Sequence, residues 1–388
     1  MTPWKRGFDA PRRRSVLCAL LLAPSLCMYL YVLLPGLRRF TSDATSPGGS
    51  VASTTSSRLA ALLAAPPPPR DPSTANLTVN LVLATLAADD VSWTAGLEAH
   101  LPNLRVVRYV SDSSTAPFRP PVPRKGREAT IWHTYLHDFY DALPDVSLLV
   151  HGHDRAWHVD GVLQGSLRFA LPRLDLAAVL GARRGYANLR VSWRDACPAW
   201  INTSLPAGRS TKQEEPYMAA AWRANFDVAA EPVPEILAGP CCSQFAVSRA
   251  AVRSRPREQY ARSRDWLVTT EWSDYIAGRT WEHLFPWLLA RAERDCPRER
   301  ETYCAMYGLC FADPETPARY NELWRERERL GEKTAFWREL LDPAGAEAAR
   351  ARAREIDAWL DEQLLPALER GQDQAVRARA ARDLYGEP

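Results

Sequence analysis

Three of the seven histidines of this 388-residue chain lie within eight residues, in the stretch LLVHGHDRAWHVD at 148–160. His151, His153 and His158 follow an apolar run that predicts a buried strand, and Asp154 lies among them. Imidazole nitrogens and a carboxylate are suitable ligands for Mn²⁺, Zn²⁺ or Fe²⁺. The stretch therefore predicts a metal-binding or proton-transfer site, with an ordinary polar loop as the alternative.

Two further stretches place polar residues next to predicted strands or helices. Asp89 and Asp90 follow the first predicted strand, and ligands gather at the carboxyl ends of parallel strands, although Asp is also common in turns. KGREA at 125–129 opens a predicted helix, where free backbone N–H groups and the side chain of Arg127 or Arg124 could receive a phosphate. Ordinary capping, with Glu128 in the first helical turn, is the alternative interpretation.

Two more candidates come from the second half of the head. Gln244 lies in GPCCSQFAVSR at 239–249, where the vicinal cysteines indicate a disulfide anchor beside a core strand. Glu282 lies in GRTWEHLFPWL at 278–288, a predicted aromatic helix. Its carboxylate either reaches solvent or, if buried among the aromatic rings, acts as a base with a raised pKa.

Strand and helix patterns alternate around these residues. The patterns predict an α/β head with a mainly parallel sheet flanked by helices. The predicted strands cover 79–87, 103–110, 146–150, 186–193 and 243–248, and the clearest helix covers 127–143.

The chain begins with features of a membrane-anchored protein. Val16–Leu34 contains nineteen uncharged residues, enough for a helix to cross a bilayer, and the heavier positive flank precedes it. This predicts a cytoplasmic tail at 1–15 and a type II signal anchor at 16–34, with a cleaved signal peptide as the alternative. The segment 35–78 is rich in Pro, Ser and Thr and predicts an extended stem.

The rest of the chain divides into a head at 79–311 and a charged helical tail at 312–388. The tail composition is typical of a solvated helical appendage, which Trp324, Trp337 and Trp359 could dock on the head.

Six cysteines follow the predicted anchor and could form three disulfides, with fifteen possible pairings. Zinc binding is the weaker alternative because no CxxC pair is present. Together with sequons at Asn76 and Asn202, the cysteines predict a lumenal head in the secretory pathway. The formal net charge is only +3 and no basic stripe is present, so we expect no nucleic-acid partner.

The motifs DDVSW, GREA, LLVHGHDRAWH, GYANLRVSW, CCSQFAVSR, GRTWEHLF and CAMYGLC together resemble the fungal domain-of-unknown-function family DUF3431, from Val79 to Cys310. Their layout also resembles GT-A-type glycosyltransferases, with HGHD in place of the usual Asp-x-Asp. This resemblance implies that a nucleotide-sugar binds against the sheet. It also implies His153 and Asp154 on the metal side and Asp90 near the nucleotide.

The resemblance further implies a Golgi or other secretory-pathway glycosyltransferase that uses a nucleotide-sugar, a divalent metal such as Mn²⁺ and a glycan or glycoprotein acceptor. Its expected catalytic residues are Glu282 and Asp154, and CCSQFAVS is expected near the acceptor. The residues expected to bind the donor are Asp90, Arg127, Glu128 and Gln244. One alternative is a metal-dependent hydrolase in which His151, His153, Asp154 and His158 activate water, and another is a non-catalytic lumenal protein whose tryptophans stack on sugars.

Overall fold

The computed structural model of the chain describes residues 71–181, 185–194, 196–206, 208–334 and 341–385, together with residues 61, 63, 64 and 67. All of them belong to one compact unit, Thr54–Pro388. The predicted cytoplasmic tail, the signal anchor and most of the stem lie outside the described residues. Among the described helices, none combines the length and hydrophobicity that a membrane span requires.

A five-stranded sheet forms the centre, and its strands lie in the order β2-β1-β3-β7-β4. The strands are β1 (Val79–Thr85), β2 (Leu104–Val110), β3 (Val146–His151), β4 (Tyr186–Asn188) and β7 (Phe245–Ser248). β2, β1 and β3 are parallel, whereas β7 is antiparallel to both β3 and β4. The predicted α/β class is confirmed, but the sheet is mixed rather than mainly parallel, because the chain enters β7 at the edge where β3 ends.

Both faces of the sheet are covered, as the apolar composition of its strands requires. Successive side chains of a strand point to opposite faces. Accordingly, Leu81 and Leu83 of β1 join one hydrophobic core, and Val82 joins the other.

Five helices contribute to the core that contains Val82. They are α3 (Arg127–Asp138), α6 (Met218–Asn225), α7 (Arg249–Arg253), α8 (Arg257–Thr269) and α9 (Asp274–Ala290). Helix α3 is shorter than predicted, since a 3₁₀ turn at Tyr140–Ala142 replaces its last residues. Its start is fixed by Gly126, whose φ is 69° and whose N–H donates to Asp274 Oδ1 over 3.0 Å.

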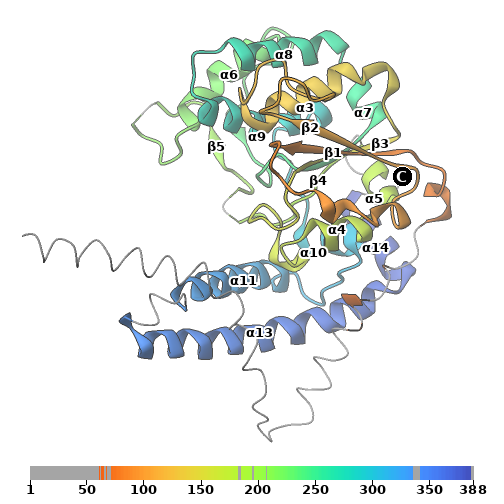
Figure 1. Cartoon of the computed structure of the whole chain (residues 1–388), viewed down its shortest axis with the longest axis vertical. Coiled ribbons are helices and arrows are strands. Elements are labelled where there is room, and N and C mark those ends of the chain that lie inside the picture. The colour runs from red at the N-terminus through yellow and green to blue at the C-terminus, as the bar shows by residue number, and fades with distance from the viewer. Residues whose placement is uncertain are drawn as a thin grey trace, which may run out of the picture. The chain divides into compact units, whose positions relative to one another are not determined.

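The helices α4 (Leu167–Arg173) and α5 (Leu176–Gly181) cover the other face together with α10 (Glu299–Tyr307). The C-terminal segment follows as α11 (Thr316–Lys333), α13 (Pro343–Gly371) and α14 (Gln374–Tyr385), and α11 lies beside α13 (Figure 1).

The helical character predicted for the tail is confirmed, but α13 is not a solvated appendage. Ile356, Leu360 and Leu364 are buried in the same core as the sheet. Trp324 and Trp359 pack against that core, whereas Trp337 lies outside the described residues. The C-terminal helices are therefore part of the fold of the head.

The remaining elements are short. They are a two-stranded sheet of β5 (Ile201–Asn202) and β6 (Ile236–Leu237) and 3₁₀ turns at Pro72–Thr74, Ser92–Thr94, Leu97–Ala99, Gly161–Leu163 and Glu215–Tyr217.

The six cysteines form three disulfides, as predicted from their number. The pairs are Cys197–Cys296, Cys241–Cys242 and Cys304–Cys310. All six sulfur atoms are engaged in these bonds, so the cysteines do not form a zinc site.

Candidate functional site

A cavity of about 490 Å³ opens at the edge of the sheet where β3 ends. We call it the reaction cavity. Its walls come from the start of α3, the loop after β3, the segment after β4, the disulfide loop before β7, and α9. Because β7 is antiparallel to β3 and β4, its start lies at the same edge as their ends.

The reaction cavity carries more positive than negative side chains. Four arginines, Arg127, Arg190, Arg194 and Arg279, line it together with two glutamates, Glu128 and Glu282. A concave surface with this excess of guanidinium groups favours an anionic ligand.

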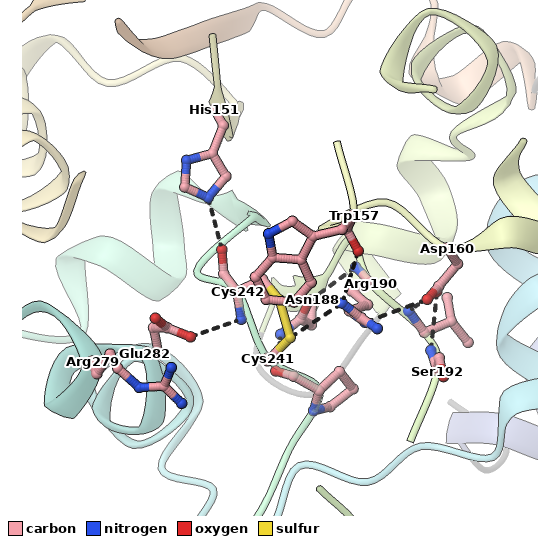
Figure 2. Close-up of a disulfide and its surroundings, with 12 residues drawn as sticks. His151, Trp157, Asp160, Asn188, Arg190, Ser192, Cys241, Cys242, Arg279 and Glu282 are labelled. Atoms are coloured by element: carbon pink, nitrogen blue, oxygen red, sulfur yellow. Dashed lines mark hydrogen bonds and ion pairs between the residues drawn. A yellow bond between two sulfur atoms is a disulfide. The ribbon is translucent and has the colours of Figure 1, made fainter. Parts of the chain in front are cut away.

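Glu282 lies on α9 and faces the disulfide loop (Figure 2). Its Oε2 accepts a hydrogen bond from the backbone N–H of Cys242 over 3.2 Å. Burial, assisted by the nearby carboxylate of Glu128, raises the pKa of Glu282 to about 7. A carboxyl group with this pKa can accept or donate a proton near neutral pH.

Arg279 is held beside Glu282 by a buried carboxylate. Its Nη2 donates to Glu214 Oε1 over 2.9 Å, and His283 Nε2 lies 3.4 Å from the same oxygen. Burial alone would raise the pKa of Glu214, but the hydrogen bonds from His283 and Arg279 outweigh it and lower the pKa to about 2. Glu214 therefore stays ionised and fixes the guanidinium group at the cavity wall.

Two of the predicted histidines lie in the reaction cavity. His151 is the last residue of β3, and its ring stacks on that of His158 with centroids 4.4 Å apart. The ring centroids of Trp157 and His158 are 4.2 Å apart, and 63% of the surface of Trp157 is exposed to solvent. Burial, with help from His151 and Arg190, lowers the pKa of His158 to about 3, so His158 is neutral.

Gln244 supports this arrangement from behind the cavity. Its buried side chain accepts a hydrogen bond from the backbone N–H of His151 over 3.1 Å, and His151 Nε2 lies 3.2 Å from the carbonyl oxygen of Cys242. This hydrogen bond positions β3 against the disulfide loop, and Gln244 is not among the residues that line the reaction cavity, so its donor-binding role stays a prediction.

Arg190 joins the aromatic side of the cavity to the disulfide (Figure 2). Its Nη1 lies 3.3 Å from the carbonyl oxygen of Trp157 and 3.3 Å from both sulfur atoms of the Cys241–Cys242 pair. Its Nε lies 3.4 Å from Asp160 Oδ1. The other oxygen of Asp160 accepts hydrogen bonds from the backbone N–H groups of residues 191 and 192 and from a tyrosine hydroxyl.

The four predicted metal ligands are not brought together. His153 is well exposed, and its Nε2 lies 3.5 Å from Asp89 Oδ1. Asp154 Oδ1 accepts hydrogen bonds from Ser166 Oγ and the backbone N–H of Arg168, both at 2.7 Å, and so stabilises the start of α4.

Only His151 and His158 remain in the cavity. Within the described ranges, no group of three or more His, Cys, Asp or Glu side chains is arranged to hold a metal ion. The four side chains are therefore not arranged as one ligand set: Asp154 accepts hydrogen bonds at the start of α4, and the exposed His153 lies beside Asp89.

The other predicted residues divide between the cavity and the surface. Arg127 and Glu128 line the cavity at the start of α3. Asp90 accepts hydrogen bonds from the backbone N–H and hydroxyl of Ser92 in an exposed turn and does not line the cavity.

Sequence reasoning did not single out Arg190 or Arg279. Arginine is common on protein surfaces, and the signal for Arg190 depends on a buried Asp160 that is thirty residues away.

Searches of curated proteins and of solved structures gave no match. Residues 81–305 match the family described as "Protein of unknown function (DUF3431)". The match covers more than half of the chain and contains the residues of the reaction cavity, from the start of α3 to α9. The chain belongs to the DUF3431 family.

Proposed function

We propose that the reaction cavity transfers a sugar from a nucleotide-sugar to a hydroxyl group of a glycan or glycoprotein. The observation that carries the proposal is the position of Glu282, a carboxylate with a raised pKa facing a cavity lined by four arginines. A base and a surface for an anionic leaving group are the two parts that such a transfer requires.

The arginines supply the charge that the leaving group needs. When the bond between the anomeric carbon and the diphosphate oxygen breaks, its electron pair leaves with the diphosphate. Guanidinium groups bind phosphate oxygens through paired N–H donors and keep their charge at all physiological pH values. Arg279 is best fixed for this task, because Glu214 holds it by a 2.9 Å ion pair.

Glu282 would act on the acceptor. The acceptor oxygen forms the new bond to the anomeric carbon, and its proton passes to the carboxylate of Glu282. Such a reaction inverts the configuration at the anomeric carbon. Because the pKa of Glu282 is about 7, a large fraction of the group is ionised and able to accept a proton at neutral pH.

The exposed ring of Trp157 gives the cavity an apolar surface beside its charges. Aromatic side chains with a free face are suited to packing against the C–H face of a sugar ring. The predicted metal ligand set is not formed, so we assign no step to a metal ion, and Mn²⁺ is tested as a separate variable.

We also propose a secretory-pathway location, with Val16–Leu34 as the signal anchor and the head in the lumen. The support comes from the three disulfides, since such bonds persist in oxidising compartments and are rare in the cytosol. Attachment of glycans at Asn76 or Asn202 in cells, detected by a mobility shift on enzymatic deglycosylation, would test lumenal exposure.

The function is tested by thermal unfolding of the detergent-solubilised full chain with a panel of nucleotide-sugars, each with Mn²⁺ or with EDTA. We expect one nucleotide-sugar to stabilise the chain in the presence of EDTA. We then expect Glu282→Gln to keep that stabilisation while sugar transfer falls by about 10²–10⁴-fold.

Three results would count against the proposal. Stabilisation by Mn²⁺ alone would favour the hydrolase. Stabilisation by neutral glycans alone would favour a non-catalytic binding protein. Full transfer activity in Glu282→Gln would remove the assigned base.

A further inference from the structure

The disulfide between Cys241 and Cys242 belongs to the wall of the reaction cavity, which both residues line. Cys241 is half-buried, whereas Cys242 is 2% exposed, so a molecule in the cavity reaches Cys241 more easily. The bond joins neighbours in the sequence and therefore cannot hold distant segments together. Its effect on the protein must be local, at the cavity itself.

The backbone of Cys242 contacts two side chains of the reaction cavity (Figure 2). Its N–H donates to Glu282 Oε2 over 3.2 Å, and its carbonyl oxygen lies 3.2 Å from His151 Nε2. The conformation of this one residue therefore sets the surroundings of both side chains.

The backbone at the disulfide has an uncommon conformation. The φ of Cys242 is 91° and that of Ser243 is 50°, in the region that residues other than glycine rarely adopt because of the Cβ atom. The disulfide closes a small ring that includes the N–Cα bond of Cys242, about which φ turns. Ring closure therefore restricts this residue to its present conformation. With the disulfide open, Cys242 is free to return to negative φ, which turns its N–H and carbonyl away from Glu282 and His151.

The chain on either side of the two cysteines is fixed by buried side chains. The carbonyl oxygen of Pro240 accepts a hydrogen bond from Asn188 Nδ2 over 2.7 Å. The carbonyl oxygen of Ser243 accepts one from Trp132 Nε1 over 3.0 Å. Opening of the disulfide should therefore move the two cysteines between these anchors and leave the rest of the fold in place.

Arg190 lies where a thiolate would form. Its Nη1 is 3.3 Å from both sulfur atoms, and its side chain is buried. A neighbouring guanidinium group stabilises the thiolate form of a cysteine. Asp160 faces a different nitrogen of the group, Nε, at 3.4 Å, and so fixes Arg190 without occupying the nitrogen that faces the sulfur atoms.

We propose that the Cys241–Cys242 disulfide is a redox switch of the reaction cavity, which low-molecular-weight thiols open by thiol–disulfide exchange. Opening releases the backbone of Cys242 from Glu282 and His151, and the proposed base loses its fixed position. Control of sugar transfer by the switch rests on the proposed function, whereas opening of the disulfide and release of the loop do not.

The exchange takes place in two steps. The thiolate of a first small thiol attacks Cys241 Sγ, the bond between the two cysteine sulfurs breaks, and its electron pair leaves on Cys242 Sγ beside Arg190. A second thiolate attacks the small-molecule sulfur of this mixed disulfide and expels the thiolate of Cys241. The two cysteines take up the two protons that the small thiols release. One protein disulfide is thus reduced, and two small thiols are oxidised to one small disulfide.

The opening is tested on the detergent-solubilised full chain in mixtures of reduced and oxidised glutathione. Free thiols are alkylated with N-ethylmaleimide and located by mass spectrometry of peptides. We expect Cys241 and Cys242 to be alkylated in less reducing mixtures than the cysteines of the other two disulfides. In such mixtures, amide hydrogen exchange should become at least about tenfold faster in the peptide that contains Cys242 and stay unchanged in α8.

Sugar transfer is measured in the same mixtures. We expect it to fall at least about tenfold when only the Cys241–Cys242 disulfide is open and to return on reoxidation. The double variant Cys241→Ser/Cys242→Ser should have the low activity at every mixture, and thermal unfolding shows whether it is folded. The measurements on the wild type need no variant and test the proposal even if this variant does not fold.

The role of Arg190 is tested by Arg190→Gln and Arg190→Lys, with Arg168→Gln as the control at an exposed position. We expect Arg190→Gln to shift the equilibrium between open and closed disulfide about tenfold toward the closed form. Arg190→Lys, which keeps a charged donor, should shift it less, and Arg168→Gln should leave it unchanged. Thermal unfolding of each variant accompanies the titration.

Three results would overturn the proposal: opening of the other disulfides before Cys241–Cys242, unchanged amide exchange at Cys242 after opening, or full sugar transfer with the disulfide open. The last result would leave the proposed function intact. Selective opening with faster amide exchange, but without sugar transfer in any mixture, would sink the proposed function and leave the redox-sensitive loop standing.

Discussion

The backbone N–H of Cys242 donates a hydrogen bond to the carboxylate of Glu282 over 3.2 Å, although the two residues belong to segments forty positions apart. The bond brings the disulfide loop before β7 against the middle of α9. It also places a carboxyl group with a raised pKa at the wall of the reaction cavity. The protonation state of Glu282 therefore affects both the stability of the fold and the proposed proton transfer.

Glu282→Gln should stabilise the protein at high pH and not at low pH. The pKa of Glu282 is about 7 in the folded chain, above its ordinary value of 4.5. Folding is therefore favoured while the group is protonated, and this stability is lost as pH rises from about 4.5 through 7.

We expect the free energy of unfolding in urea to be the same for the variant and the wild type at pH 4.5. At pH 8 it should be about 1–3 kcal/mol higher for the variant. Glu322→Gln, at an exposed site, is the control. An equal difference at both pH values would contradict the raised pKa.

Asp154→Ala should destabilise the fold without changing metal affinity. Its carboxylate accepts two 2.7 Å hydrogen bonds at the start of α4, from Ser166 Oγ and the N–H of Arg168. Loss of these bonds should lower the free energy of unfolding, measured with a chemical denaturant, by about 1–3 kcal/mol. Asp154→Asn, which keeps an acceptor oxygen, should cost less. If calorimetry showed that Asp154→Ala binds Mn²⁺ more weakly than the wild type, while its free energy of unfolding is unchanged, Asp154 would again be assigned as a metal ligand.

Glu214→Ala should be among the most damaging changes near the cavity. Glu214 is 1% exposed and is the shared acceptor for Arg279 and His283. Removing it leaves a partly buried guanidinium group without its counter-charge, which costs about 3–5 kcal/mol.

The measurement is urea unfolding at pH 7. Glu214→Gln keeps one acceptor oxygen, so its free energy of unfolding should fall less than that of Glu214→Ala. Near-equal unfolding midpoints for Glu214→Ala and the wild type would show that Arg279 is held by other contacts.

Gly371→Ala should loosen the C-terminal helices. A Cβ atom at Gly371 would lie 1.7 Å from the backbone oxygen of Gly308, so α13 and the end of α10 must separate. We expect the free energy of unfolding to fall by about 1–3 kcal/mol and amide hydrogen exchange to become faster in α13 and α14.

Gly331→Ala is the matched control, because a Cβ atom there meets nothing within 4 Å and lies inside α11. Alanine should stabilise that helix by about 0.5–1 kcal/mol. Slow exchange retained in Gly371→Ala would show that the close approach is not required.

The sequence was sufficient for the main elements of the head. Apolar runs predicted β1, β2, β3 and β7, because buried strands leave a strong local signal. They could not give the direction of β7, since alternation of side chains is the same in either direction. The strand predicted at 186–193 ends at Asn188, whose side chain donates to the carbonyl of Pro240 and accepts from the N–H of Arg190.

The candidate site was only partly predictable. Glu282, Arg127 and Glu128 were identified because each lies in a distinctive helical segment, and all three line the reaction cavity. Asp154 was predicted as a metal ligand, whereas its carboxylate accepts hydrogen bonds at the start of α4, and an aspartate in either role looks the same in a sequence. The reaction cavity as a whole could not be predicted, since its walls come from segments as far apart in the sequence as the start of α3 and α9.

The disulfide between Cys197 and Cys296 has a practical consequence for obtaining the protein. It joins positions 99 residues apart and fixes the loop after Trp193 to the segment before α10. Closing a loop of this length stabilises a fold by about 4–5 kcal/mol in the chain-entropy description. Bacterial cytoplasm keeps thiols reduced, so expression there should give a chain in which these two segments are not joined, whereas a eukaryotic secretory host should yield the intact arrangement.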